Sequence, residues 1–143
     1  MKLVVDANVL FSALITRGIT AELLFDDELR LFAPEFLFEE FSLHEKEVLE
    51  KTHRTPEEFR HLCGILRRRI SVVPVAELLP WLDEARRITP DEKDSAYFAT
   101  AMALGRRAAL WSNDSHLKEQ KRISVISTEE LVRILRGKKT STS

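Results

Sequence analysis

The chain has 143 residues, of which 44% are hydrophobic and 31% charged, and its formal net charge at pH 7 is −1. This length suits one compact domain with a buried core, and the composition is that of an ordinary globular protein. The four glycines and five prolines argue against a loop-dominated or disordered chain. Cys63 is the single cysteine, so an intrachain disulfide and a CxxC zinc site are excluded.

The sequence predicts a cytoplasmic protein that does not cross a membrane. Asp6 interrupts the apolar run at the N-terminus, so we expect no cleavable signal. No stretch approaches the length of a membrane-spanning helix, and a lone cysteine fits a reducing compartment. We expect residues 1–137 to form a single domain and residues 138–143 to form a polar C-terminal tail.

Basic residues occur in clusters along this nearly neutral chain. A cluster of this kind either contacts nucleic-acid phosphates or forms an ordinary solvated helix face, and the second interpretation is favoured for any single cluster. The clusters are Arg67 to Arg69, Arg86 with Arg87, Arg106 with Arg107, Lys118 with Lys121 and Arg122, and Arg136 with Lys138 and Lys139.

Strand-like and helical segments alternate along the chain. Short apolar runs rich in β-branched residues predict strands, and segments with helical periodicity predict helices. The expected strands are residues 2–5, 29–33, 71–75, 108–111 and 123–126. The expected helices are residues 9–15, 20–26, 35–51, 56–69, 76–87, 90–104 and 130–136.

Three of the helices have clear start signals. Thr55-Pro56-Glu57-Glu58 places threonine as the cap, proline in first position and Glu58 in position to close a capping box. Thr89-Pro90-Asp91-Glu92 repeats the arrangement and predicts a helix that ends at Gly105. Ser127-Thr128-Glu129-Glu130 predicts the cap of the last helix.

Strands that alternate with helices predict an α/β fold, a three-layer α/β/α sandwich with a mostly parallel central sheet. In open sheets of this kind the functional crevice lies beyond the carboxyl ends of the strands. Asp6 directly follows the first expected strand, and Asp114 comes three residues after the fourth. Asp94 lies one turn past Asp91 on the same helical face. A pair of glutamates in the helix after the second strand completes the set of candidates.

Each acid also has a purely structural explanation. Asp6 would cap the following helix, and Asp91 lies in a first helical turn, where the helix dipole favours acids. Of the glutamate pair, Glu40 or its neighbour Glu39, one is expected to face solvent. Asp94 is harder to explain in this way, because the helix that follows it is so apolar that it must be largely buried.

Carboxylates that converge on one crevice raise each other's pKa unless a cation joins them. Hard oxygen ligands select magnesium or manganese, and two such ions about 4 Å apart are a recurring device for phosphodiester hydrolysis. In that device one ion orients and deprotonates the attacking water, and the other stabilises the leaving oxygen. Because the sequence shows no suitable catalytic serine or cysteine constellation, the acids favour metal-assisted hydrolysis.

Four segments carry a resemblance to a known family. They are Val4-Val5-Asp6-Ala7-Asn8-Val9-Leu10, Ala33-Pro34-Glu35-Phe36-Leu37-Phe38-Glu39-Glu40, Asp91-Glu92-Lys93-Asp94 and Trp111-Ser112-Asn113-Asp114. In their order and their span of nearly the whole chain, they resemble the motifs of the PIN-domain family. Within that family the chain is most similar to small prokaryotic, especially archaeal, single-domain members akin to the toxin of VapBC toxin–antitoxin pairs.

The resemblance implies a metal-dependent endoribonuclease and assigns its site. The acidic metal site would consist of Asp6, Glu40, Asp94 and Asp114, with Asp91 as an extra ligand or only a cap. Asn8 would orient Asp6, and the supporting donors would be Ser12, Ser112 and Asn113. The choice of Glu40 over Glu39 rests on the apolar residue after it, Phe41.

The resemblance also implies cofactor and partners. These are Mg²⁺ or Mn²⁺, an RNA substrate, a homodimer and, in toxins, a small antitoxin protein that blocks the site. Residues 45–69 form a longer segment than the most compact toxins have, which leaves the relationship to an antitoxin open.

The remaining candidates favour structural roles or rival classes. The four histidines lack metal-ligand spacing, and Trp81 and Trp111 are expected in the core rather than as base-stacking platforms. A phosphatase of the haloacid-dehalogenase kind would need an acid where Asn8 stands, and a signalling receiver domain would need one after the third strand. The non-enzymatic alternative is a PIN-like module that binds RNA or protein without cutting it.

Overall fold

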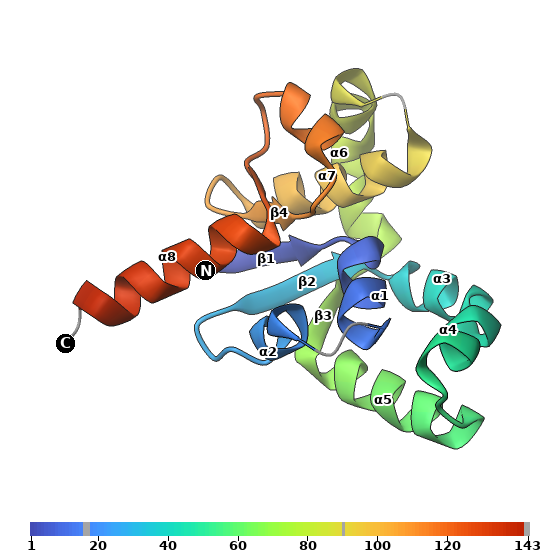
Figure 1. Ribbon diagram of the computed structural model, residues 1–143. Coiled ribbons are helices and arrows are strands. Elements are labelled where there is room, and N and C mark those ends of the chain that lie inside the picture. Colours follow the sequence, from blue (N-terminus) through green and yellow to red (C-terminus); the bar gives the residue numbers. More distant parts are fainter. Residues whose placement is uncertain (16–17, 90, 142–143) are drawn as a thin grey trace.

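The computed structural model describes residues 1–15, 18–89 and 91–141 (Figure 1). The described residues form five strands in one sheet with the order β3-β2-β1-β4-β5, and every neighbouring pair is parallel. The strands are β1 Lys2–Val5, β2 Arg30–Pro34, β3 Ile70–Val73, β4 Ala109–Trp111 and β5 Val125–Ile126. The helices are α1 Ala7–Ile15, α2 Ile19–Leu24, α3 Leu37–Leu43, α4 Glu45–Thr52, α5 Pro56–Arg69, α6 Val75–Ile88, α7 Glu92–Leu104, η1 Ser115–Glu119 and α8 Thr128–Ser141.

The sheet lies between two layers of helices, which confirms the predicted three-layer α/β/α fold. Figure 1 shows α6 and α7 on one side of the sheet and α1, α2 and α5 on the other. Helix α7 packs against β1, β2 and β4, and its residues from Ser95 to Met102 are all buried. A buried sheet of short parallel strands explains why these strands are apolar without alternation.

The five strands were all predicted, with boundaries that differ by at most two residues. The helix predicted over residues 35–51 is instead two helices, α3 and α4, which meet at His44. The Ser42 hydroxyl donates to the Phe38 carbonyl oxygen at 3.0 Å, and the His44 amide bonds the Phe41 carbonyl three residues back. Such bonds bend and tighten the end of a helix, and the His44 ring is held edge-on against Phe11.

Two helix ends also differ from the prediction. Asp91, not Thr89, is the N-cap of α7, and its carboxylate accepts a 2.9 Å hydrogen bond from the amide of Lys93; Pro90 lies outside the described residues. Gly105 ends α7 with a φ of 108°, as its position predicted. Helix α8 continues to Ser141, beyond the expected end at Arg136, and residues 142–143 of the expected tail lie outside the described residues.

An aromatic stack fixes the helices that surround the carboxyl edge of the sheet. The ring of Phe41 on α3 lies parallel to Phe11 on α1, with centroids 4.9 Å apart, and to Phe59 on α5 at 5.7 Å. The start of α5 has the predicted capping box between Thr55 and Glu58. Because α1 follows Asp6 and α3 carries Glu40, this stack sets where two of the candidate acids lie. Within the part of the chain that the structure describes, no helix has the length and apolarity needed to cross a bilayer.

Candidate active site

Asp6 lies at the carboxyl end of β1, where hydrogen bonds fix both of its carboxylate oxygens. Its backbone amide donates to the carbonyl of Trp111 at 3.1 Å and so continues the pairing of β1 with β4. The hydroxyl of Ser112 donates to Oδ2 of Asp6 at 2.7 Å, and the backbone amide of Asn8 donates to Oδ1 at 3.3 Å. The expected contribution of Asn8 to the orientation of Asp6 thus comes from its backbone, and the residue itself is exposed.

Burial raises the pKa of the Asp6 carboxyl above its ordinary value. The hydrogen bonds from Ser112 and from the amide of Asn8 oppose this rise, while the negative charge of Asp114 adds to it. Asp6 is therefore a carboxylate held in one orientation in surroundings that penalise its charge.

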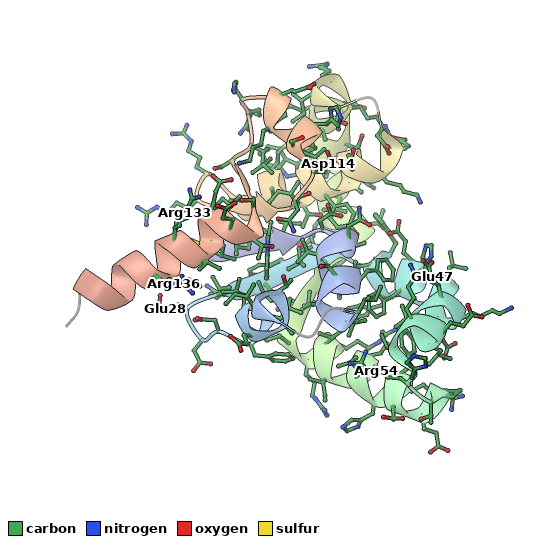
Figure 2. The ribbon with its side chains drawn as sticks, viewed as in Figure 1. Glu28, Glu47, Arg54, Asp114, Arg133 and Arg136 are labelled. Atoms are coloured by element: carbon green, nitrogen blue, oxygen red, sulfur yellow. The ribbon has the colours of Figure 1, made fainter. Side chains whose placement is uncertain are left out.

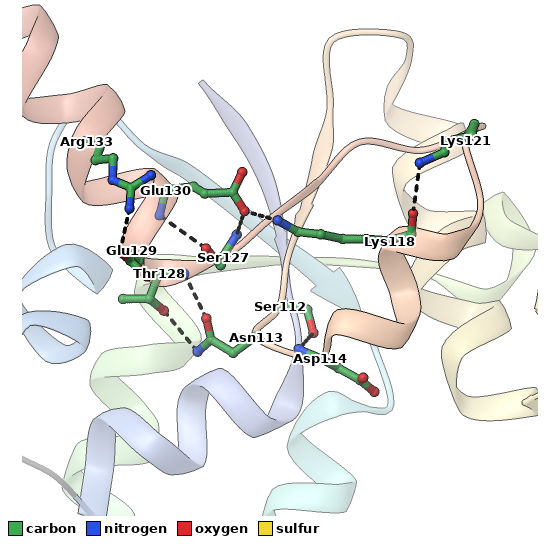
Figure 3. Close-up of polar contacts among 10 residues, drawn as sticks. All are labelled: Ser112, Asn113, Asp114, Lys118, Lys121, Ser127, Thr128, Glu129, Glu130 and Arg133. Carbon is green, nitrogen blue, oxygen red and sulfur yellow. Dashed lines mark hydrogen bonds and ion pairs between the residues drawn. The ribbon is translucent and has the colours of Figure 1, made fainter.

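Asp114 and Asn113 are neighbours with different roles. Figure 3 shows their side chains pointing in opposite directions. Asn113 accepts a hydrogen bond from the amide of Thr128 at 2.8 Å and donates to the Thr128 hydroxyl at 3.1 Å, so it is joined to the start of α8 rather than to the acids. Asp114 caps η1 by accepting from the amide of His116 at 3.0 Å, and its own amide donates to the hydroxyl of Ser112 at 3.2 Å.

Asp94 lies in the first turn of α7, partly buried among other acids. Burial, followed by the charges of Asp91, Asp6 and Asp114 in that order, raises the pKa of its carboxyl to about 6. These residues come from β1, α7 and the segment after β4, which the parallel sheet brings to one edge. The structure thus gathers four of the predicted acids into one electrostatically coupled group.

Glu40 is also near this group, whereas Glu39 is not. Glu39 is exposed and Glu40 is only partly exposed. The Tyr97 hydroxyl has a pKa raised first by burial and then by the charges of Glu40 and Asp6, with a smaller contribution from Asp94. Of the glutamate pair, Glu40 is thus the less exposed member and the one whose charge acts on the Tyr97 hydroxyl.

Two hollows flank the acids and share Asp114 as a wall. One, of about 380 Å³, is lined by Asp6, Asn8, Val9, Ser12, Asn113 and Asp114. The other, of about 270 Å³, lies between the start of α7 and η1, and it combines acids with the apolar side chains of Ile88, Phe98 and Leu117. The acids thus line two adjoining cavities that share Asp114.

The donor set fits a hard divalent cation in its chemistry. Carboxylate oxygens are the ligands that Mg²⁺ and Mn²⁺ prefer. The pKa values of Asp6 and Asp94 are raised first by burial and in addition by the charges of neighbouring acids, and a cation would offset both effects. Within residues 1–15, 18–89 and 91–141, no three or more histidine, cysteine, aspartate or glutamate side chains are yet arranged to hold a metal ion. The acids lie within electrostatic reach of one another without forming a closed cage.

Several members of the basic clusters form contacts within the fold. Arg69 donates to backbone carbonyls of the turn between α2 and β2, and the Arg67 guanidinium lies 4.6 Å from the centre of the Phe38 ring. Other members form ion pairs, which include Arg86 with Glu92, Arg122 with Glu84 and Lys118 with Glu130. In Figure 2 Arg54 and Arg136 lie well away from Asp114. The solvated or structural interpretation therefore fits these clusters.

Sequence reasoning did not single out Tyr97. It counted this residue among the apolar side chains of the buried helix, and its ring is indeed buried. A signal was available, because Tyr97 lies one turn after Asp94 on the same helical face and a buried tyrosine hydroxyl usually needs a partner. Trp111, expected in the core, is fully buried and donates from Nε1 to the Thr128 hydroxyl.

The fold and the site together define an α/β domain with a cluster of carboxylates at the carboxyl edge of a parallel sheet. The family model of the PIN domain matches residues 4–134. The chain therefore belongs to the PIN-domain family, which confirms the resemblance seen in its four motifs.

Comparison with solved structures finds a similar fold in a chain of VapBC2 from Rickettsia felis, in a crystal structure bound to a DNA fragment from their promoter. The TM-score is 0.68 and the sequence identity 15%, and the match covers 89% of this chain and 98% of that one. At this identity the likeness concerns the fold. The comparison with curated proteins finds no match.

Proposed function

We propose that this protein is a metal-dependent ribonuclease that hydrolyses phosphodiester bonds of RNA. The observation that carries the proposal is the pKa of Asp94, which the charges of Asp91, Asp6 and Asp114 help to raise to about 6. Such a concentration of negative charge is costly for a fold and is useful where a cation binds. Membership of the PIN-domain family supports a nuclease as the use of this site.

The proposed cofactor is Mg²⁺ or Mn²⁺, held by Asp6, Asp94 and Asp114, with Glu40 and Asp91 beside them. A divalent cation in such a site supplies charge stabilisation for the phosphoryl group and lowers the pKa of a water molecule. The protein's own contribution is orientation. Ser112 fixes Oδ2 of Asp6, and the cap of η1 fixes Oδ1 of Asp114.

The two hollows support a polymeric substrate. Because the two hollows adjoin at Asp114, an RNA strand that crosses this acid would occupy both of them. The second hollow has an apolar side at Ile88, which is partly exposed and could contact the flat apolar face of a base.

The test is cleavage of a mixed pool of labelled single-stranded RNAs with Mn²⁺ or Mg²⁺. Wild type is compared with Asp6→Asn and Asp94→Asn, and Asp27→Asn is the matched control, because Asp27 is exposed at the opposite edge of the sheet. Cutting that needs metal, disappears in both site variants and persists in the control supports the nuclease. Equal cutting by all four proteins means a contaminant or a different site.

Failure to cut would favour the non-enzymatic alternative. If folded wild type binds Mn²⁺ and RNA but leaves every RNA intact, the protein is a silent PIN-like module. A haloacid-dehalogenase-type phosphatase is less favoured, since Asn8 stands where its second acid is required, and release of phosphate from a monoester substrate would be its sign.

A toxin role with a small protein antitoxin, and a homodimer, are part of the same proposal. The toxin role is supported by the fold shared with a chain of the VapBC2 structure, and the homodimer rests on the resemblance to the PIN-domain family. Induced expression of wild type should arrest bacterial growth, and Asp6→Asn should not. A short adjacent reading frame whose product binds the protein and restores growth would identify the antitoxin, and sedimentation would give the oligomeric state.

A further inference from the structure

Tyr97 holds a buried polar atom for which the fold provides no partner. The residue is 4% exposed and comes from the middle of α7. Its hydroxyl makes no hydrogen bond, and it is the one buried side-chain polar atom without a partner among the residues that the structure describes. An unsatisfied buried polar group costs free energy and calls for an explanation.

The proton of this hydroxyl is the group left without a partner. The backbone amide of Ala7 lies beside the phenolic oxygen and slightly favours its ionised form. An amide can only donate, so even a close approach by Ala7 would leave the phenolic proton with no acceptor. Tyr97 therefore presents a hydrogen-bond donor, and what it lacks is an acceptor such as a carboxylate.

Three carboxylates act on this donor through their charge. The charge of Glu40 has the largest electrostatic effect on the hydroxyl, followed by Asp6 and then Asp94. Tyr97 is not among the residues that line either hollow, so its hydroxyl does not face a substrate bound there. Its role must therefore be exerted through an acid.

Packing joins Tyr97 to the helix that carries Glu40. The rings of Phe36 and Tyr97 meet edge to face, with centroids 5.8 Å apart and planes at 83°. The amide of Glu40 donates to the carbonyl of Phe36 at 3.0 Å, which makes the two residues the ends of the first turn of α3. Residues four apart lie on the same helical face, so the contact with Phe36 sets Glu40 on the side of Tyr97.

We propose that Tyr97 is a positioning residue for Glu40, whose carboxylate accepts the phenolic O–H when the acids close around a divalent cation. This inference rests on the proposed function, because it assumes a cation at the acids. It assigns Glu40 rather than Glu39 to the site, since the exposed Glu39 does not face the hydroxyl. In the cation-free protein the Tyr97 hydroxyl has no acceptor for its proton, which explains why it is unsatisfied.

The test measures Mn²⁺ binding to the full-length protein by calorimetry, together with thermal unfolding in EDTA and in Mn²⁺. Tyr97→Phe should leave the melting temperature in EDTA equal to or above that of wild type, because it removes an unpaired buried hydroxyl. It should weaken Mn²⁺ binding about tenfold, the usual effect of losing a partner of a metal ligand. The matched control is Thr100→Val on the same helix, where the buried hydroxyl is paired with the Ala96 carbonyl. It should lower the melting temperature in both conditions and leave Mn²⁺ affinity unchanged.

A double-mutant cycle identifies the acid through which Tyr97 acts. Glu40→Gln should weaken Mn²⁺ binding, Glu39→Gln should not, and Tyr97→Phe combined with Glu40→Gln should bind as Glu40→Gln alone. Additive losses, or an unaltered affinity in Tyr97→Phe while Glu40→Gln is weakened, would overturn the role of Tyr97 and leave the proposed function intact. A wild type that neither binds Mn²⁺ nor cuts RNA would remove the proposed function itself. A Tyr97→Phe variant that fails to fold would show that the hydroxyl is paired, which also overturns the inference.

Discussion

The hydroxyl of Ser112 donates a 2.7 Å hydrogen bond to Oδ2 of Asp6 and thereby joins residues 106 positions apart in the sequence. Ser112 is 1% exposed and follows β4, and Asp6 follows the adjacent strand β1. The same hydroxyl oxygen accepts from the amide of Asp114 at 3.2 Å. One small side chain therefore joins two acids that follow different strands.

Replacing this serine should disturb both stability and the site. In Ser112→Ala the Asp6 carboxylate loses a hydrogen bond that opposes the rise of its pKa, so stability should fall by about 2 kcal/mol, as for hydrogen bonds to charged groups. Mn²⁺ affinity should fall about tenfold. Ser115→Ala, at an exposed position in η1, is the control. Denaturant unfolding and calorimetry measure the two effects, and unchanged Mn²⁺ affinity would contradict this role.

Arg69 should matter for stability and not for the site. Its guanidinium donates to the carbonyls of Leu24, Asp26 and Leu29, the last two at 2.7 and 2.9 Å, and so holds the turn from α2 to β2 against the end of α5. Arg69→Ala should lower the free energy of unfolding by about 2 to 3 kcal/mol, because charge-assisted bonds to buried carbonyls are lost.

The neighbouring Arg68 provides the comparison for this prediction. It is exposed, so Arg68→Ala should change the free energy of unfolding by less than about 0.5 kcal/mol. Urea unfolding measures both variants. Equal stabilities would mean that the carbonyl contacts of Arg69 contribute nothing, and a loss of RNA cleavage by folded Arg69→Ala would point to a phosphate contact instead.

The fold could be predicted because its signals are local. Each strand is a short apolar run, and the box at the start of α5 is complete, with Thr55 and Glu58 exchanging hydrogen bonds of 3.1 Å. The break at His44 could not be predicted, since it depends on the hydrogen bond that the Ser42 hydroxyl donates to the Phe38 carbonyl and on the contact of the His44 ring with Phe11 on α1. Helical periodicity runs through this break without a signal of its own.

The acids of the site follow from topology, whereas the neighbours of those acids do not. Asp6 and Asp114 could be placed together because parallel strands end at the same edge of a sheet. The partners of Asn113 and Tyr97 depend on the direction of each side chain. Asn113 turns to Thr128 although it stands next to Asp114, and the Tyr97 hydroxyl lies among acids although its helix reads as apolar.

Asn113 gives a prediction that separates these roles. Because both ends of its amide bond Thr128, Asn113→Ala should destabilise the start of α8 and lower the free energy of unfolding by about 1 kcal/mol. Mn²⁺ affinity should remain within about twofold of wild type, since the side chain points away from Asp114. Thermal unfolding and calorimetry measure these effects. A tenfold loss of Mn²⁺ affinity in a folded variant would instead make Asn113 a supporting donor of the metal site.

In the absence of a cation, Asp94 should make the folded protein less stable as the pH rises. Its pKa is raised from 3.8 to about 6 in the folded protein, so between these values the folded state binds more protons than the unfolded state. Stability in EDTA should therefore fall as the pH rises from about 4 to 6, and the cost is complete above pH 7. Asp6 acts in the same direction, because its pKa is also raised.

The substitution Asp94→Asn removes the loss of stability caused by the ionised carboxylate and tests whether that carboxylate binds a cation. In EDTA at pH 7.5 the variant should be more stable than wild type by about 1 kcal/mol, a value reduced for the partial exposure of the group, or about 3 °C in melting temperature. At pH 4 the two should be nearly equal, because the wild-type carboxyl is then largely protonated. Added Mn²⁺ at pH 7.5 should stabilise wild type and have little effect on the variant, since the cation binds the ionised acid. If Asp94→Asn were less stable than wild type in EDTA at pH 7.5, the ionised Asp94 would stabilise the cation-free fold as a paired structural acid. The proposal that this carboxylate is kept in the fold to bind a cation would then be contradicted.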